Sequence, residues 1–169
     1  MDPRVSLRPL IPSDVATYAP WGLDRRFCEH AGWTVDLPLS AHEAHWHNLV
    51  VGPHPDLVRL AAVVGDDVVG YVDLHGLDPR HRELGYVVGP ASRWGQGFGI
   101  AIARLGLDHG FRVLGLEEIR AEALDANHAS IRILISLGMT ETGRGADEPF
   151  LGAPSFYRRF SLTTADWLA

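Results

Sequence analysis

Arg93-Trp94-Gly95-Gln96-Gly97-Phe98-Gly99 is the stretch that decides how this chain folds. It follows the apolar run Leu84-Gly85-Tyr86-Val87-Val88 and opens a helical pattern that continues to about Leu114. A strand, a glycine-rich loop and a helix together form a common cradle for pyrophosphate. The glycines let the backbone come close, and the free N–H groups of the helix N-terminus point at the anion. Many tight strand-to-helix turns are glycine-rich for packing reasons alone, so the loop by itself is a weak signal.

The spacing of these glycines differs from that of the usual nucleotide-binding motifs. A dinucleotide fold needs G-x-G-x-x-G after the first strand and an acidic residue about twenty residues later. Here Gly95, Gly97 and Gly99 alternate, and the segment lies in the middle of the chain after an apparently antiparallel run. A P-loop needs Gly-Lys-Ser/Thr, which is absent. The sequence therefore favours a phosphate cradle that belongs to neither class.

Hydrophobic periodicity on either side of the loop predicts an α/β (α+β) fold. β-rich runs predict seven strands, at residues 5–10, 57–64, 68–74, 83–88, 119–124, 139–143 and 155–162. Helical patterns begin at Ser13 or Asp14, at Ser40 with Glu43 completing a capping box, at the glycine-rich loop, and at Asn127, with Gly138 as the stop. Residues 22–38 show no clear pattern. The order β-α-α-β-β-β-α-β-α-β-β predicts a mixed sheet with helices on its faces.

Length, charge and cysteine content narrow the class of protein. The chain of 169 residues suffices for one domain with a full core, and no repeat or linker divides residues 1–169. Its net charge of −6 argues against a general nucleic-acid binder. No apolar run reaches membrane length, and residues 1–20 lack a basic-then-apolar secretion signal. The single cysteine, Cys28, excludes an internal disulfide. We therefore expect one cytoplasmic domain that binds neither nucleic acid nor a membrane.

The motifs taken together resemble a known family. A strand, Trp94-Gly95-Gln96-Gly97-Phe98-Gly99, a long helix, a second strand, Asn127-x-x-Ser130 and Leu137-Gly138-Met139 resemble the GNAT superfamily of acetyl-CoA-dependent N-acetyltransferases. The resemblance is strongest to the branch of ribosomal-protein N-terminal (serine or alanine) acetyltransferases, which the tail 157–163 also suits. It implies a mostly antiparallel central sheet of six to seven strands, flanked by about four helices, with strands splayed around the cofactor.

The resemblance implies that acetyl-CoA binds along the loop and between the strands at 83–88 and 119–124. Where the superfamily usually has Arg or Gln at the first loop position, this chain has Trp94, so backbone N–H groups must bind most of the phosphate charge. Arg93 or Arg132 would add positive charge. By the same alignment, Val87 or Val88 offers a backbone N–H to the acetyl carbonyl, and Asn127 binds the pantetheine arm. The residues thereby expected to bind the cofactor are Val87, Val88, Arg93, Trp94, Gly95, Gln96, Gly97, Phe98, Gly99, Asn127 and Ser130.

Two carboxylates compete for the role of general base in amine acetylation. The spacing of Glu83 from the loop resembles that of the glutamate in histone-type members, and Glu122 matches the glutamate of ribosomal-protein alanine acetyltransferases. We expect Glu83 slightly more than Glu122, because the strand of Glu83 also presents the N–H expected to bind the acetyl group. Each is otherwise an ordinary exposed acid on a strand. The tyrosine that many members use as the acid is replaced here by Leu134. Ser130 matches the serine proposed as the acid in the serine acetyltransferases, although helix capping or packing would explain it equally.

The acceptor amine is expected to enter beside residues 20–50 and the late loop. Trp33 and Trp46 lie where the family builds its acceptor pocket, and His75 could bound the same cleft, although core packing explains the tryptophans as well. The histidines near residue 45 do not form H-E-x-x-H, so no metal site is expected. The acceptor would be an amine-bearing small molecule or a protein N-terminus. The protein could also form a homodimer, because dimers are common in the family. The alternative function is a non-catalytic acyl-CoA-binding or sensing domain.

Overall fold

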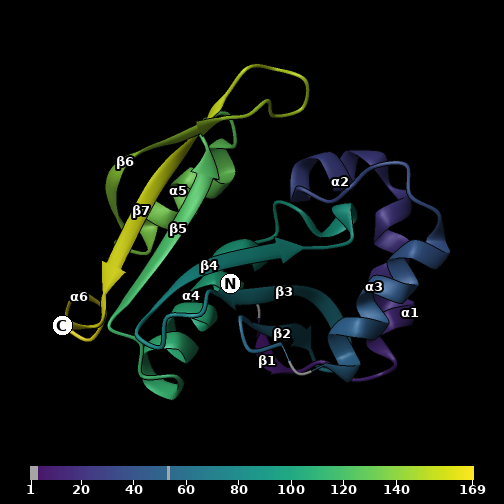
Figure 1. The fold of residues 1–169 in the computed structure, drawn as a ribbon, viewed down its shortest axis with the longest axis horizontal. Helices are drawn as coiled ribbons and strands as arrows, with labels where there is room; N and C mark the ends of the chain where they lie inside the picture. Colours follow the sequence, from purple (N-terminus) through teal and green to yellow (C-terminus); the bar gives the residue numbers. More distant parts are fainter. Residues whose placement is uncertain (1–3, 53) are drawn as a thin grey trace.

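The centre of the fold is a seven-stranded sheet in the order β1-β2-β3-β4-β5-β7-β6 (Figure 1). The computed structural model describes residues 4–52 and 54–169. Neighbouring strands are antiparallel except for β4 and β5, which are parallel. The strands are β1 (Ser6–Pro9), β2 (Leu57–Val64), β3 (Asp67–His75), β4 (His81–Val88), β5 (Glu118–Leu124), β6 (Thr140–Asp147) and β7 (Phe156–Thr163). The predicted fold class and the predicted strands are confirmed.

The helices differ from the prediction in number and in two caps, because the first helix follows Ser13 without a side-chain capping hydrogen bond. Within residues 4–52 and 54–169 they are α1 (Asp14–Tyr18), α2 (Arg25–Ala31), α3 (Leu39–Val51), α4 (Phe98–Asp108), α5 (His128–Ser136) and α6 (Thr164–Trp167). The sequence predicts about four, because α2 lies in the stretch without a pattern and α6 is a single short turn. α3 begins after Pro38 without a side-chain cap, so the predicted capping box of Ser40 and Glu43 does not form. A π-helical segment, His109–Val113, extends α4 and accounts for the apolar pattern reaching Leu114.

Helices cover both faces of the sheet, and each face has its own apolar core. α4 and α5 pack on one face, against residues such as Leu84 and Ile119. α1, α2 and α3 pack on the other face of the β1–β4 half, where Tyr18 stacks on Trp46 beside Tyr71. Burial on both faces explains why β3 is an almost continuous apolar run instead of an alternating one. In the described part of the chain, no helix is both long enough and apolar enough to cross a membrane.

The feature that positions the site is the separation of β4 from β5. The two strands are paired only at their first residues, and the register ends where Glu83 faces Arg120. Beyond that point β4 stays paired with β3 as far as Val88, while β5 continues against β7 as far as Leu124. The strands therefore diverge, as Figure 1 shows. The splay that the resemblance implies is present, and it leaves backbone polar groups of β4 facing an opening.

Candidate active site

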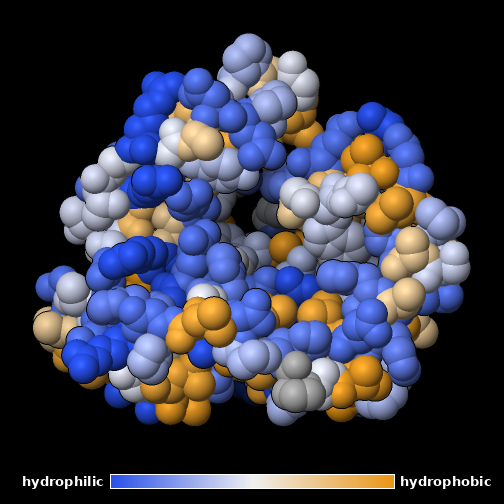
Figure 2. Space-filling view, viewed as in Figure 1, coloured by the Kyte–Doolittle hydropathy of each residue, from blue (hydrophilic) through white to orange (hydrophobic). Residues whose placement is uncertain are grey.

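A cleft of about 740 Å³ occupies the opening between the two diverging strands. The space-filling view shows the molecule hollowed between the part that carries β5–β7 and the part that carries α1–α3 (Figure 2). β4 and β5, the glycine-rich loop, α5, α2 and the β6–β7 loop all contribute to its walls. Segments from the whole length of the chain therefore meet in one site.

The glycine-rich loop forms one end of the cleft. Gly95 and Gly97 have φ values of 76° and 84°, a backbone conformation that side chains with a β-carbon rarely adopt. Gly97 is also the N-cap of α4, so the unpaired N–H groups of the first helical turn lie beside the cleft. Trp94, Gly95, Gly97, Phe98 and Gly99 line it. Gln96 does not, because its exposed side chain turns back and donates to the Ser92 carbonyl.

Two arginines, Arg93 and Arg132, also line the cleft. Arg93 approaches Asp67 only at 3.9 Å, and its side chain stays partly exposed. Arg132 projects from α5, and none of the described residues forms an ion pair with it. Guanidinium groups are well suited to phosphate because they donate several N–H groups in a fixed plane. The cleft lining therefore contains a helix N-terminus and two arginines, which are groups suited to binding an anion.

Trp94 links this loop to the end of β4. Its indole N–H donates to the Val88 carbonyl at 2.9 Å. Its ring lies against the imidazole of His30, with the ring centroids 4.5 Å apart, and the Arg26 guanidinium lies 5.5 Å from its centroid. The tryptophan thus holds the loop, β4 and α2 together.

The backbone of β4 presents one amide to the cleft near the loop. The Gly89 N–H donates to the Val69 carbonyl, so it points toward β3. Successive residues of an antiparallel strand direct their amide groups to opposite sides. The amide of Val88 therefore faces away from β3, toward the space that β5 has left, whereas that of Val87 faces β3. Of the two residues predicted to bind the acetyl carbonyl, Val88 has the suitable orientation.

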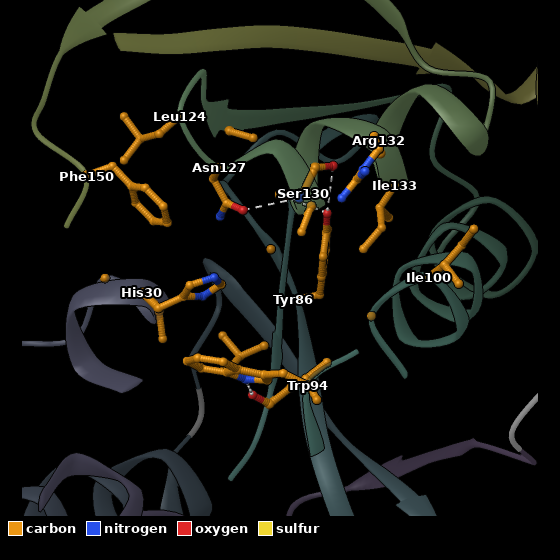
Figure 3. Close-up of a pocket in the computed structure, with 18 of the residues that line it drawn as sticks. His30, Tyr86, Trp94, Ile100, Leu124, Asn127, Ser130, Arg132, Ile133 and Phe150 are labelled. Atoms are coloured by element: carbon orange, nitrogen blue, oxygen red, sulfur yellow. Dashed lines mark hydrogen bonds between the residues drawn. The ribbon is translucent and has the colours of Figure 1, made fainter. Parts of the chain in front are cut away.

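The N-terminus of α5 forms the wall opposite Trp94. Asn127 caps this helix by accepting from the Ser130 N–H at 3.2 Å, which is the capping role that its sequence position allows. The Ser130 hydroxyl lies 2.7 Å from the hydroxyl of Tyr86, which comes from β4 (Figure 3). Burial raises the pKa of Tyr86 to about 12, so this phenol stays protonated near neutral pH. Leu134, at the position of the missing tyrosine, is 1% exposed and belongs to the core.

The two candidate glutamates differ in their relation to the cleft. Glu122 lines it, but its Oε1 accepts a hydrogen bond from the Arg159 guanidinium at 2.7 Å. Glu83 lies outside the residues that line it, on the paired part of β4, with its carboxylate 3.7 Å from His75. Both carboxylates help to raise the pKa of Tyr157, after burial and a hydrogen bond to Glu148. The glutamates therefore share one region of charge, but only Glu122 reaches the cleft.

The structure does not bring the predicted acceptor-pocket residues to the cleft. Trp46 is buried between Tyr18 and Tyr71, and Trp33 donates its indole N–H to the Tyr71 hydroxyl at 2.8 Å. His75 points from the exposed end of β3 toward Glu83. The reason is that both tryptophans pack in the apolar cluster around Tyr71, between the sheet and helices α1, α2 and α3.

Other residues, which the sequence reasoning did not select as acceptor contacts, form the second end of the cleft. They come from α2 and from the loop after β6, and they are Phe27, Glu29, His30, Glu148, Phe150 and Tyr157. The signal for α2 was present in its caps. Asp24 accepts from the Phe27 N–H at the start, and Gly32, with φ of 74°, ends the helix. Within residues 4–52 and 54–169, no group of three or more His, Cys, Asp or Glu side chains is arranged to hold a metal.

The family comparison agrees with this geometry. A family model described as "Acetyltransferase (GNAT) domain" matches residues 4–140. The uncharacterized N-acetyltransferase p20 of Bacillus licheniformis is 32% identical over 80 residues, which make up 46% of this chain and 44% of that protein. The match thus spans less than half the length of this curated relative.

Solved structures resemble the fold over nearly the whole chain. The spermidine N-acetyltransferase from Vibrio cholerae, in complex with CoA and spermine, has a TM-score of 0.84 at 18% identity, over 98% of this chain and 99% of that one. The acetyltransferase (GNAT family) from Bacillus anthracis has a TM-score of 0.80 at 16% identity, over 98% of both chains. At these identities the likeness establishes the shared fold.

Proposed function

Because this chain belongs to the GNAT family of acetyltransferases, we propose that it transfers the acetyl group of acetyl-CoA to the primary amine of a small cationic acceptor. The observation that carries the proposal is the divergence of β4 from β5 after Glu83. It brings an anion-binding loop, the backbone amide of Val88 and a carboxylate-lined pocket into one cleft.

The first end of the cleft fits the pyrophosphate of coenzyme A. The glycine backbone and the α4 N-terminus offer N–H groups, and Arg93 and Arg132 offer positive charge. The gap between β4 and β5 leads from there past Asn127 and provides a channel for the pantetheine arm. Acetyl-CoA supplies the thioester whose carbonyl carbon the amine attacks. The Val88 N–H is placed to donate to the oxygen of that carbonyl, where negative charge develops in the transition state.

Charge at the second end favours a cationic acceptor. Glu29 and Glu148 line this end of the cleft, and Glu122 also lines the cleft, where Arg159 is hydrogen-bonded to it. The net charge of −6 adds to the attraction of cations. A neighbour in fold, the Vibrio cholerae enzyme, is described as a spermidine N-acetyltransferase bound to spermine. A polyamine therefore belongs in the first set of acceptors to test.

Ser130 is placed to assist the leaving thiolate. Its hydroxyl lies at the N-terminal turn of α5, where the helix dipole stabilises negative charge. The Tyr86 hydroxyl can donate to the Ser130 oxygen, which frees the serine proton to point toward the sulfur. In this arrangement Tyr86 orients the donor and Ser130 contacts the reacting atom.

A thiol-release assay with purified protein and acetyl-CoA tests this function. The acceptors are spermidine, simple diamines, and peptides that begin with serine or alanine, with a reaction lacking acceptor as the control. We expect the highest kcat/KM with a small polycation. Higher kcat/KM with the peptides would favour the N-terminal acetyltransferase branch instead. Binding of acetyl-CoA without turnover of any amine would support the non-catalytic acyl-CoA-binding alternative and refute the proposal.

A further inference from the structure

His30 is a titratable side chain of the cleft that the proposed function has not used. It comes from α2, lines the cleft and packs against Trp94 of the glycine-rich loop. We propose that His30 is the catalytic residue that accepts the proton lost by the acceptor amine, and this inference rests on the proposed function. This would make an imidazole, and neither of the two glutamates predicted from sequence, the general base.

Two aromatic contacts hold the imidazole in place. Its ring lies against the Trp94 indole at 4.5 Å and 31°, and the edge of Phe150 lies 5.4 Å away at 63°. Figure 3 shows the ring extending from α2 into the space between Trp94 and Asn127. Among the residues that the structure describes, none forms a hydrogen bond with its ring nitrogens. A fixed ring with unoccupied nitrogens at an open cleft is available to a substrate.

A short chain of contacts connects His30 to the acetyl-binding amide. Trp94 contacts the imidazole through its ring and the Val88 carbonyl through its indole N–H, at 2.9 Å. The base is therefore fixed relative to the strand end that receives the thioester carbonyl. Ser130 and Tyr86 lie on the opposite wall. An amine entering from the α2 side would have the proton acceptor beside its nitrogen and the hydroxyl donor beyond the carbonyl, next to the sulfur.

The protonation state of His30 suits this role. Burial, and then the nearby Arg26 guanidinium, lower its pKa, so the ring is neutral and has a free lone pair at pH 7. Arg26 on its own helix is the charged group that acts on its pKa, and Glu29, Arg93 and Glu148 are charged residues that line the same cleft.

The proposed acetyl transfer conserves bonds and protons. The nitrogen lone pair of the neutral amine forms the C–N bond, and the nitrogen then carries a surplus proton. That proton passes to the free imidazole nitrogen of His30. The C–S bond breaks with its electron pair on sulfur, and the sulfur takes the proton of the Ser130 hydroxyl. Water then returns a proton to Ser130, and His30 releases the amine proton to water. The products are the amide and the free thiol.

The test compares His30→Phe with the wild-type protein. Both are assayed with acetyl-CoA and with whichever of the polyamine, diamine and peptide acceptors gives the highest kcat/KM. Phenylalanine keeps the contact with Trp94 but has no lone pair. Removal of a general base should lower kcat on the order of 10²–10⁴-fold near pH 7. The wild-type kcat should also fall as the pH drops through the lowered pKa of His30, and the variant should lack this fall. His109→Phe is the matched control, because burial also lowers the pKa of His109, which lies outside the cleft.

Two further measurements keep the outcome decisive. Calorimetry should give the same acetyl-CoA affinity for His30→Phe and wild type, and added imidazole should restore turnover to His30→Ala. Unchanged kcat in His30→Phe, or a loss confined to KM for the acceptor, would overturn the inference and leave the proposed function standing. Absence of wild-type turnover with every amine would refute the proposed function and this inference with it.

Discussion

Replacing Gly97 with alanine separates phosphate binding from backbone strain. Gly97 has φ of 84° and lines the cleft at the start of α4. Gly138, just after α5, has φ of 85°, and a β-carbon added there meets nothing within 4 Å. It lies outside the cleft lining. Gly138→Ala therefore imposes nearly the same backbone strain without touching the proposed cofactor site, and it is the matched control.

The magnitudes follow from these two properties. A residue with a β-carbon costs about 1–2 kcal/mol in the left-handed conformation. For a chain of this length, each kcal/mol lowers Tm by about 2–4 °C, so both variants should lose a similar and modest amount of thermal stability. Only Gly97→Ala should also hold the phosphates away from the loop backbone. We expect its Kd for acetyl-CoA to rise by about tenfold or more, which corresponds to about 1.4 kcal/mol.

Calorimetric titration with acetyl-CoA, alongside thermal unfolding of each variant, measures both effects. The expected pattern is an equal loss of Tm in the two variants and weaker binding in one. If folded Gly97→Ala binds acetyl-CoA as tightly as Gly138→Ala does, the glycine-rich loop is not the phosphate cradle. Equal weakening in both variants would also refute the reasoning, because strain alone would then explain it.

Three other outcomes follow from the site and the core. Ser130→Ala should lower kcat more than it raises KM for acetyl-CoA. Adding Tyr86→Phe to this variant should lower kcat little further, because both side chains act through one hydroxyl pair. Additive losses of kcat in steady-state kinetics would contradict this. Glu122→Gln should raise the acceptor KM with little change in kcat, and Glu83→Gln should change neither, whereas loss of kcat in either would restore a glutamate as the base. The pKa values of buried tyrosines such as Tyr18 and Tyr86 are raised by burial, so above about pH 10 the unfolded chain releases protons first and stability should fall. The chain has no lysine to titrate in that range, so a denaturant midpoint that stays constant from pH 8 to 11 would refute this assignment.

The sequence by itself determined the parts of the site that depend on local geometry. Glycines at 95 and 97 adopt positive φ because the chain must turn from a strand into a helix there. Asn127 caps α5 because its side chain reaches the N–H of Ser130, three residues later. Trp94 belongs to the same short motif. Each of these features depends on neighbours within one turn, so the short motifs that carry the family resemblance were enough to bring the five residues to one expected site. All five line the cleft, and their binding of the cofactor stays a prediction.

Long-range packing decided the rest. Residues 22–38 have no clear periodicity, so α2 and the position of His30 could not be derived, although Asp24 and Gly32 mark the two helix ends. Trp46 is a residue type that often forms the wall of a pocket, but here it is packed in the core, in the apolar cluster with Tyr18.

Only the tertiary structure could assign roles to residues that act in pairs. In the sequence Tyr86 is an ordinary strand residue. Only the packing of α5 shows that Ser130 lies beside its hydroxyl. Glu122 becomes a paired carboxylate only because β7 brings Arg159 next to it. Strands, turns and caps form through contacts between near neighbours, which a linear pattern records. The side chains that share a cleft are chosen by the packing of segments far apart in the chain, and no local pattern contains that information.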